Sequence, residues 1–417
     1  MVFSFQKKDK NRQSPIANRL WVVTELYYPE ETSTGYYLTR IAEGLTEDFE
    51  VKVLCGQPNY SAKGVKAPKR EIHKNVEIFR SFGTTFNKNV IIFRLLNMVA
   101  LSLSTFFRAL VNFKQGDLIL VVTNPPSLPF IAAIASLLRG ASYVLLIHDN
   151  YPEILVAAKK TKENSFFVKT LNYFNRWLFK YTSKIIVCGR DMFELIGKKT
   201  AGLDIPIETI PNWAELETVK PAPRINNSLL KELGITEKLV FLYAGNMGYP
   251  NDIESIIECA EILKDDERFC FVFLGTGVKR QWLAREVENK CLKNVKLLAP
   301  RPRSEQNIFL NACDVAIVTL VKKMWGVSMP SRTYNILAAG KPILAMTEEN
   351  SEIARVVEED NVGWTVVPGN PEKLLQKILE INDAKNLFVD LGKNARQAAL
   401  KKYSLEKAIE KYRVSLK

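Results

Sequence analysis

The segment Pro330–Pro342 combines the residue types that open and close a short helix with a basic side chain near its start. It reads Pro-Ser-Arg-Thr-Tyr-Asn-Ile-Leu-Ala-Ala-Gly-Lys-Pro. Ser328 or Ser331 is predicted to cap this helix, Gly340 to end it, and Pro342 to prevent its continuation. The pattern therefore predicts an exposed helix N-terminus that Ser331 opens.

Arg332 falls in the first turn of that helix, where a cation is unfavourable unless an anion neutralises it. A nucleoside diphosphate would be such an anion, and Lys322 and Lys323 in the preceding loop could contribute further charge. The alternative interpretation is a solvent-facing arginine on a capped helix. We expect a pyrophosphate group at Arg332 and the amides that follow Ser331.

His148 and Asp149 directly follow the apolar run Tyr143–Ile147. The carboxyl end of a parallel strand is where open α/β sheets bind their ligands. Histidine can donate a hydrogen bond to a sugar hydroxyl and stabilise developing charge. We predict that both residues are catalytic; a histidine satisfied within its own loop is the alternative.

Two glycine-containing loops follow successive apolar runs in the second half of the chain. The first holds Gly245, Asn246 and Gly248, and the second holds Gly275 and Gly277. Glycine at such positions lets backbone N–H groups approach a phosphate. Tight turns also need glycine, so either loop alone is a weak indication. Two of them in successive β–α units favour a ligand-binding edge.

The loop after the first apolar run has small residues at Thr32–Gly35. It lacks the GxGxxG pattern, so the dinucleotide-binding fingerprint is absent. Thr34 and Gly35 would allow a ligand to approach the backbone closely. An ordinary strand–helix loop, capped by Ser33 or Thr34, is the alternative.

Short strand-like runs alternate with helical patterns throughout, which predicts an α/β fold with two doubly wound, Rossmann-like domains facing a cleft. We expect strands at 20–24, 51–55, 76–81, 118–122, 143–147, 184–187 and 207–210, and then at 239–243, 269–274, 295–298, 315–319, 342–345 and 365–367. Prolines 211, 221 and 223 indicate an interdomain linker. The expected organisation is a basic tail at 1–18, a first domain at 19–211, a linker at 212–227, a second domain at 228–400, and a C-terminal helix at 401–417 that can cross back to the first domain.

The composition of the 417 residues is that of a globular protein, with 47% hydrophobic and 25% charged residues. A net charge of +13 favours anionic partners. No RRM, zinc-finger or homeodomain pattern is present, so we expect no nucleic acid partner. Six cysteines without a CxxC pair indicate reduced thiols and a cytoplasmic location, and with only two histidines we expect no metal.

The first 18 residues have no apolar core, which argues against a secretory signal. No uninterrupted apolar run reaches the roughly 18–20 residues that span a bilayer. The helix predicted at Val90–Phe113 comes nearest, and Arg94, Asn97, Ser104 and Arg108 form a narrow polar stripe on it. Such a helix either packs against the first sheet or lies in a membrane interface. We therefore consider peripheral contact with an anionic membrane, at the inner face of the cytoplasmic membrane.

Together these segments resemble glycosyltransferase family 4, retaining enzymes of GT-B fold, over nearly the whole chain. The resemblance is carried by Glu25–Arg40, Thr123–Pro126, His148–Val156, Ile210–Trp213, Ala244–Ile257, Leu274–Gly277, Pro330–Pro342, Ser351–Ala354 and Gly363–Gly369. It is greatest to the subgroup that makes bacterial O-antigen, capsule or colanic-acid-type polysaccharides, including transferases of N-acetyl-L-fucosamine type.

The resemblance implies an N-terminal acceptor domain and a C-terminal nucleotide-sugar donor domain. It places Gly35 beside the donor phosphate and the acceptor, and His148 against the transferred sugar. The Gly245–Gly248 loop and Arg332 would face the diphosphate. The Gly275–Gly277 loop, with Arg301 and Arg303, would lie near the nucleoside.

Four positions depart from the family pattern. An Arg and a Lys that pair with the diphosphate in many members are Asn246 and Asn251 here, and the paired glutamates are Val327 and Asn335. Asn335 could still bond the ribose, and Glu352 could take over part of the glutamate role.

The resemblance implies transfer of a hexose from a nucleoside diphosphate sugar, with UDP expected, to a lipid-linked or oligosaccharide acceptor without a metal. Two alternatives stay open: a nucleotide-sugar epimerase of the same fold, and a non-catalytic relative that binds nucleotide or a partner protein. The departures at 246, 251, 327 and 335 are the best support for the second.

Overall fold

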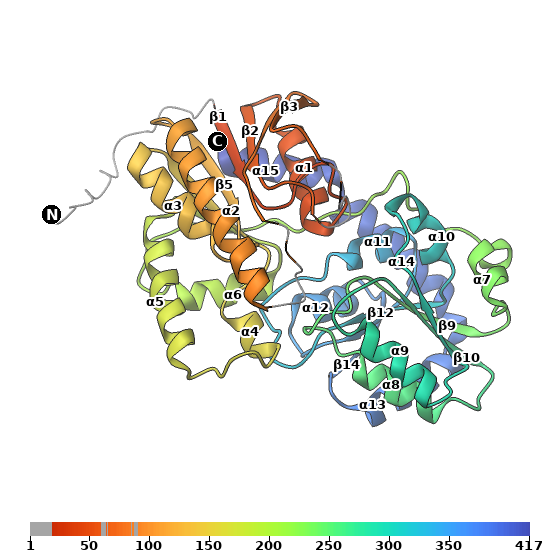
Figure 1. Cartoon of the computed structure of the whole chain (residues 1–417). Coiled ribbons are helices and arrows are strands. Elements are labelled where there is room, and N and C mark those ends of the chain that lie inside the picture. The colour runs from red at the N-terminus through yellow and green to blue at the C-terminus, as the bar shows by residue number, and fades with distance from the viewer. Residues whose placement is uncertain (1–18, 60–63, 65, 85, 87–90) are drawn as a thin grey trace.

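The computed structural model describes all residues except 1–18, 60–63, 65, 85 and 87–90, and it consists of two α/β lobes (Figure 1). The predicted basic tail therefore lies outside the described residues. We use "N-terminal lobe" for residues 19–210 and "C-terminal lobe" for residues 224–402.

The N-terminal lobe is built on an eight-stranded sheet in the order β3-β4-β2-β1-β5-β6-β7-β8, parallel except for β3. Its order around β1 and β5 reverses, which creates a switch point at the carboxyl ends of these strands. The strands are β1 (Arg19–Val23), β2 (Glu50–Cys55), β3 (Arg70–His73), β4 (Val76–Arg80), β5 (Leu118–Val122), β6 (Ser142–Ile147), β7 (Lys184–Val187) and β8 (Ile207–Thr209).

The C-terminal lobe has a six-stranded parallel sheet in the order β11-β10-β9-β12-β13-β14, the arrangement of a dinucleotide-binding domain. Its switch point lies between β9 and β12. The strands are β9 (Leu239–Ala244), β10 (Phe269–Leu274), β11 (Val295–Leu298), β12 (Val315–Thr319), β13 (Ile343–Met346) and β14 (Gly363–Val366).

Helices cover both faces of each sheet because the central strands, such as β5 and β10, are apolar on both sides. One face of the N-terminal sheet is covered by α2 (Ile91–Asn112), α3 (Leu128–Arg139), α5 (Phe166–Tyr181) and α6 (Arg190–Lys199), and the other by α1 (Ser33–Gly44). In the C-terminal lobe, α8 (Glu254–Ile262), α9 (Arg280–Asn289) and α13 (Pro371–Asp383) pack on one face. The opposite face carries α10 (Gln306–Asn311), α11 (Arg332–Ala338), α12 (Glu352–Glu359) and α14 (Phe388–Lys402). The short helices α4 (Glu153–Ala157) and α7 (Ser228–Leu233) complete the lobes, with 3-10 turns at Arg224–Asn226, Arg303–Glu305 and Lys385–Leu387.

The last helix, α15 (Leu405–Leu416), belongs to the N-terminal lobe although it ends the chain (Figure 1). Its apolar face joins the core that α1 forms with the sheet. Arg413 pairs with Glu47 and Asp48 at the end of α1. The chain therefore crosses between the lobes twice, which ties them together.

The predicted strands agree with the observed ones to within two residues at each end, and the prediction missed β3. That strand is a short, polar, antiparallel edge, Arg-Glu-Ile-His, which has no apolar alternation to reveal it. The alternative interpretation of this loop placed the cap of α1 at Ser33 or Thr34, whereas Thr32 is the cap and its hydroxyl accepts from the Gly35 amide.

Candidate active site

The side chain of Arg332 lies against the loop that follows β9. Its guanidinium stacks 4.5 Å from the ring centre of Tyr243 and donates a long hydrogen bond of 3.4 Å to Asn251 Oδ1. A Cβ on Gly245 would lie 3.0 Å from the guanidinium carbon, and the φ of +149° at this position favours glycine. Its Nη1 is buried and has no hydrogen-bond partner in the described structure. A buried cationic donor without a partner is costly, and an anionic ligand would satisfy it.

The two glycine loops of the C-terminal lobe pack directly on each other. The Gly245 amide donates to the Leu274 carbonyl, and the Met247 amide donates to the Thr276 carbonyl. A Cβ on Gly275 would lie 2.1 Å from the Gly245 carbonyl oxygen, and one on Gly277 would lie 2.5 Å from the Met247 carbonyl oxygen. These glycines thus allow close loop packing at the edge of the sheet, and Gly248 is buried in the same loop. Asn246 is exposed, and its carbonyl accepts from the Tyr243 hydroxyl at 2.6 Å.

His148 and Asp149 stand at the carboxyl end of β6, where Thr123 at the end of β5 holds their backbone. The Thr123 hydroxyl accepts from both amides, at 3.2 and 3.3 Å. Burial lowers the pKa of His148 to about 4 and raises the pKa of Asp149 to about 6. The imidazole is therefore neutral at pH 7, and its Nε2 is buried without a hydrogen-bond partner in the described structure. It is free to bond a polar group of a ligand.

Both lobes meet at this point. Asp149 forms a β-bridge with Ser328, and the Asn150 amide donates to the Val327 carbonyl at 2.8 Å. On the other side, the hydroxyls of Ser33 and Ser331 lie 2.7 Å apart. The starts of α1 and α11 and the end of β6 therefore converge on the interlobe surface, which brings His148 and Arg332 to the same region from opposite lobes.

The start of α11 differs from the prediction. Ser331 has helical backbone angles and makes no capping hydrogen bond, since its hydroxyl faces Ser33 instead. Ser328 lies in the bridge to Asp149. Neither serine is a side-chain cap, so the prediction of a capped N-terminus is wrong. Gly340 has a φ of +62° and ends the segment as predicted.

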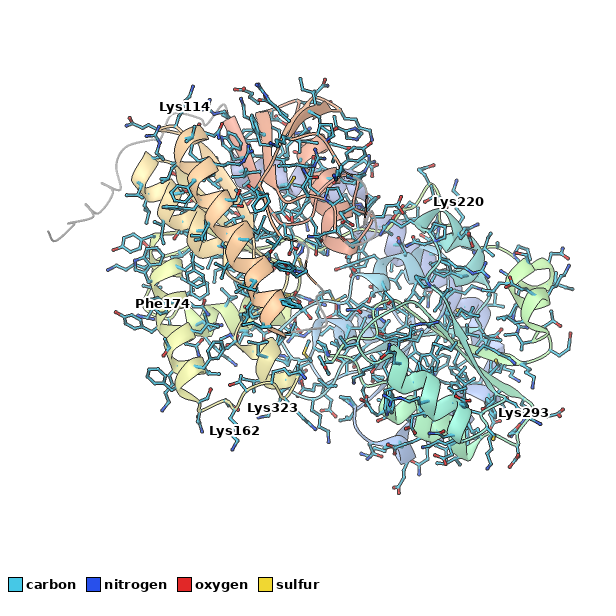
Figure 2. The ribbon with its side chains drawn as sticks, in the orientation of Figure 1. Lys114, Lys162, Phe174, Lys220, Lys293 and Lys323 are labelled. Atoms are coloured by element: carbon cyan, nitrogen blue, oxygen red, sulfur yellow. The ribbon has the colours of Figure 1, made fainter. Side chains whose placement is uncertain are left out.

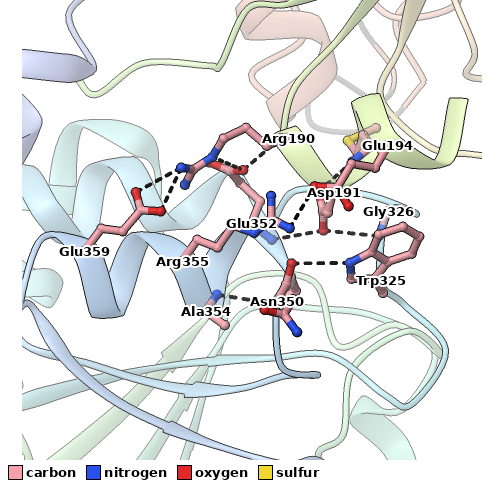
Figure 3. A network of polar contacts seen from close by, with 12 residues as sticks. Arg190, Asp191, Glu194, Trp325, Gly326, Asn350, Glu352, Ala354, Arg355 and Glu359 are labelled. Carbon is pink, nitrogen blue, oxygen red and sulfur yellow. Dashed lines mark hydrogen bonds and ion pairs between the residues drawn. The ribbon is translucent and has the colours of Figure 1, made fainter. Parts of the chain in front are cut away.

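Glu352 belongs to an ion-pair network between the lobes (Figure 3). Its Oε2 accepts from the amide of Arg190, at 2.8 Å, and from its guanidinium, at 3.0 Å. Arg190 also pairs with Glu359. Asp191 accepts from the amides of Gly326 and Glu352, at 3.1 and 3.0 Å. Glu352 therefore holds α6 against α12, and its charge is already compensated by Arg190.

The other predicted basic residues mostly have partners within the protein. Arg301 pairs with Glu232 and Glu305, and Lys323 pairs with Glu163 of the N-terminal lobe. Arg303 pairs with Glu215, and its guanidinium lies 3.9 Å from the ring centre of Tyr36 on α1, across the lobe interface. The charges of Arg301, Lys323 and Arg303 are therefore compensated within the protein.

Lys322 is exposed beside Gly369 and has no ion pair among the described residues. Thr34 is half-buried and Gly35 buried at the start of α1. A Cβ on Gly35 would lie 2.7 Å from the Glu30 carbonyl oxygen, so glycine is needed there for the loop's own packing.

The family described as glycosyl transferases group 1 matches residues 227–398. A probable glycosyltransferase of Pseudomonas aeruginosa, WbjE, is 30% identical over 396 residues, covering 94% of this chain and 96% of that protein. The chain belongs to the glycosyl transferases group 1 family. It is therefore a glycosyltransferase, as the resemblance implied.

Other relatives of the glycosyltransferase agree with this assignment. A putative colanic acid biosynthesis glycosyl transferase of Escherichia coli strain K12, WcaI, is 24% identical over 373 residues, covering 84% of this chain and 89% of that protein. Among solved structures, sucrose-phosphate synthase from Thermosynechococcus elongatus superposes with a TM-score of 0.77 at 13% identity, over 95% of this chain and 98% of that one. Anabaena HepE in complex with UDP-glucose superposes with a TM-score of 0.70 at 15% identity, over 95% and 99%. The fold is GT-B.

The positions at which this glycosyltransferase departs from the family pattern have clear structural roles. Asn251 bonds Arg332 and donates to the Asn246 carbonyl at 3.1 Å, so it orients the arginine. Asn335 accepts from the Glu215 amide at 2.8 Å and donates to Gln306. Val327 is buried. Asn335 thus supports the linker, and both its carbonyl oxygen and its amide nitrogen already make one hydrogen bond within the protein.

Two supporting residues escaped the sequence analysis of the site. Thr123 positions His148 and Asp149, and Asp191 organises the lobe interface. Thr123 begins the Thr-Asn-Pro-Pro run that contributed to the resemblance, so its position after an apolar strand was a usable signal. Asp191 lies one residue into a helix and carried no signal, because its partners are backbone amides far along the chain.

Proposed function

We propose that this glycosyltransferase transfers a hexose from a UDP-sugar to a lipid-linked or oligosaccharide acceptor in the synthesis of a bacterial surface polysaccharide, with retention at the anomeric carbon. The observation that carries the proposal is the buried, unpartnered Nη1 of Arg332, next to the Gly245 loop at the switch point of the C-terminal sheet. A diphosphate bound there would supply the missing acceptor. The UDP-glucose complex of HepE, a protein of the same fold, supports UDP as the nucleotide.

The two lobes have separate tasks in this proposal. Arg332 and the amides of the Gly245 loop stabilise the charge that develops on the departing diphosphate. From the opposite lobe, neutral His148 donates or accepts one hydrogen bond with a sugar hydroxyl and thereby fixes the donor. The ionised carboxylate of Asp149 accepts a hydrogen bond from a hydroxyl of donor or acceptor. Asn251 is a positioning residue, because it acts through Arg332.

The chemical step is a front-face substitution. The bond between the anomeric carbon and the diphosphate oxygen breaks, and a bond from the acceptor oxygen forms on the same face of the sugar. The acceptor's proton passes to the departing phosphate oxygen. This route needs no covalent sugar–enzyme intermediate and therefore no carboxylate nucleophile.

The proposal includes no metal cofactor. Among the described residues, no group of three or more His, Cys, Asp or Glu side chains is arranged to hold a metal ion. We expect activity to be unchanged by prolonged dialysis against EDTA. Loss of activity on dialysis, with recovery on adding Mg²⁺ or Mn²⁺, would contradict this part of the proposal.

The test is a melting-temperature panel with nucleoside diphosphates and their sugars, followed by transfer assays. A ligand that binds the native state raises its melting temperature. UDP and a UDP-sugar should stabilise the protein more than the ADP and GDP counterparts. With an acceptor present, the product's anomeric configuration should match that of the donor by NMR. Inversion, or conversion of the donor alone without an acceptor, would refute the proposal.

A further inference from the structure

The long helix α2 presents an apolar surface to solvent. Every exposed side chain on its described residues is apolar, and these recur at helical spacing along its length: Ile92, Phe93, Leu95, Leu96, Val99, Leu103, Phe107 and Val111. The stretch Leu95–Asn112 is long and apolar enough to cross a membrane, yet only 22% of it is buried inside the protein. An ordinary core helix would instead hide this surface.

Two residues of the predicted polar stripe, Asn97 and Ser104, bond to the segment that precedes the helix. Asn97 bonds Thr84 and the backbone of Phe86, and the Ser104 hydroxyl accepts from the Phe82 amide. Arg94 has no described side chain. The side chains that pack on the sheet are Leu101, Thr105 and Ala109. The interpretation that this helix packs against the first sheet is thus confirmed for one side, and the apolar opposite side is exposed among the described residues.

The exposed apolar surface continues over the neighbouring helices α3 and α5, which lie on the same face of the sheet as α2 (Figure 1). Ile134 and Leu138 are exposed on α3. Exposed aromatic side chains on α5 are Phe166, Phe167, Tyr173 and Phe174. Figure 2 shows Phe174 at the outer edge of α5, pointing away from the body of the lobe. We call the exposed side of these three helices the α2–α3–α5 face.

The charge of this face has one sign. The three helices contain no Asp or Glu, and their basic residues are Arg94, Arg108, Arg139, Lys169, Arg176 and Lys180. Lys114 and Lys162 flank the helices and are exposed (Figure 2). None of the described basic side chains among these has an ion-pair partner in the described structure. Aromatic and aliphatic side chains mixed with unpaired lysine and arginine are the composition of a surface that binds an anionic membrane interface.

A small apolar pocket lies beside the candidate active site. Phe130 of α3 and Leu171 of α5 are among its lining residues, and so are Thr123 and Asp149 at the carboxyl ends of β5 and β6. Phe130 and Leu171 lie one helical turn from exposed Ile134 and Phe167 respectively. The surface and the site are therefore neighbours within one lobe.

We infer that the α2–α3–α5 face docks this glycosyltransferase onto the surface of an anionic phospholipid bilayer, with its aromatic and aliphatic side chains at the level of the headgroups. A second copy of the chain is a poorer occupant, because two such faces would bring like charges together without any acid to pair them. The inference deepens the proposed function, since a lipid-linked acceptor would reach Asp149 from the same side. Binding to lipid nevertheless requires no transfer, so it can be tested separately.

The first experiment is flotation of the full chain with vesicles, without sugar nucleotide. Binding to vesicles containing phosphatidylglycerol should exceed binding to pure phosphatidylcholine at least tenfold and should weaken as salt rises. The variant Phe107→Ser/Phe174→Ser should lower binding at least tenfold, because both side chains are exposed and would enter the interface. The control Ile225→Ser/Val389→Ser, which changes two exposed apolar residues of the C-terminal lobe, should bind like wild type.

The second experiment reverses charge. Lys169→Glu/Lys180→Glu should lower binding to phosphatidylglycerol vesicles at least tenfold, whereas Lys293→Glu/Lys373→Glu on the C-terminal lobe should lower it less than threefold. Equal effects of the two pairs, or no lipid binding at all, would overturn the inference. So would a wild-type dimer that Phe107→Ser/Phe174→Ser converts to monomers, as shown by light scattering. A melting-temperature rise with UDP in the same preparations separates failure of this inference from failure of the proposed donor.

Discussion

Replacing Arg332 with methionine should weaken UDP binding without destabilising the free protein. A hydrogen bond to a charged group contributes about 1.5–3 kcal/mol. Loss of the guanidinium should therefore raise the Kd for UDP about 10- to 150-fold. In the free protein two effects oppose each other. The variant loses the contact with Tyr243, worth about 0.5–2 kcal/mol, and it removes the buried donor Nη1, whose desolvation costs about 1–3 kcal/mol. The melting temperature without ligand should thus change by no more than about 2 °C.

The assay is thermal unfolding with and without UDP, supported by calorimetric titration. At a UDP concentration 100 times the wild-type Kd, the ligand stabilises the native state by about 2.7 kcal/mol. A complex that is about 30-fold weaker keeps only about 0.9 kcal/mol at the same concentration. Most of the UDP-induced rise in melting temperature should therefore disappear in Arg332→Met.

Arg301→Met is the matched control. It removes the same side chain from the same lobe, but Arg301 is already compensated by Glu232 and Glu305. Its Kd for UDP should stay within about twofold of wild type, on the order of a few tenths of a kcal/mol. A wild-type Kd in Arg332→Met, or equal losses in both variants, would refute the assignment of the diphosphate to Arg332.

Three further predictions concern the supporting structure. Because burial raises the pKa of Asp149 to about 6, kcat/KM should fall about tenfold per pH unit below about pH 6 as the carboxylate is protonated. His148→Gln should keep this fall in kcat/KM at acid pH, since burial lowers the pKa of His148 to about 4, whereas Asp149→Asn should abolish it. The reverse pattern would contradict the assignment of the fall to Asp149 rather than His148. Asp191→Ala should lower the free energy of unfolding by about 3 kcal/mol or more, and the melting temperature by several degrees, because it leaves buried backbone amides unpaired. An unchanged melting curve would contradict the role of the interlobe network. Gly275→Ala should lower both the melting temperature and the affinity for UDP, because the new Cβ would lie 2.1 Å from a carbonyl oxygen. The control Gly197→Ala in α6, whose new Cβ has nothing within 4 Å, should melt at or above the wild-type temperature. Equal behaviour of the two variants would show that the loop packing is not required.

Much of the fold could be predicted because its signals are local. Strands such as Leu118–Val122 and Phe269–Leu274 are continuous apolar runs, which only a sheet covered on both faces requires. Their alternation with helices implies parallel sheets, and the carboxyl ends of those sheets are where His148 and Gly245 were expected to matter. These inferences need no knowledge of distant contacts.

The ion pairs could not be predicted in the same way. Glu352 and Arg303 have the charges that a nucleotide site would use, and nothing in their neighbours along the chain shows that each already has a partner. Arg190 lies 162 residues before Glu352, and Glu215 lies 88 residues before Arg303. A charge is available to a ligand only if the fold has left it uncompensated, which depends on contacts between distant segments.

The sequence by itself determined the α/β class, the two lobes' strand pattern, and membership of a transferase family, because apolar periodicity and short motifs are properties of contiguous residues. Only the tertiary structure decided that Arg332 keeps a buried donor and has no ion pair among the described residues, whereas Arg301, Arg303 and Glu352 each have one. It also decided that Asn97 and Ser104 of α2 bond within the protein while apolar side chains of the same helix are exposed. Both outcomes depend on which surfaces the packed lobes cover, and that is a property of the whole fold.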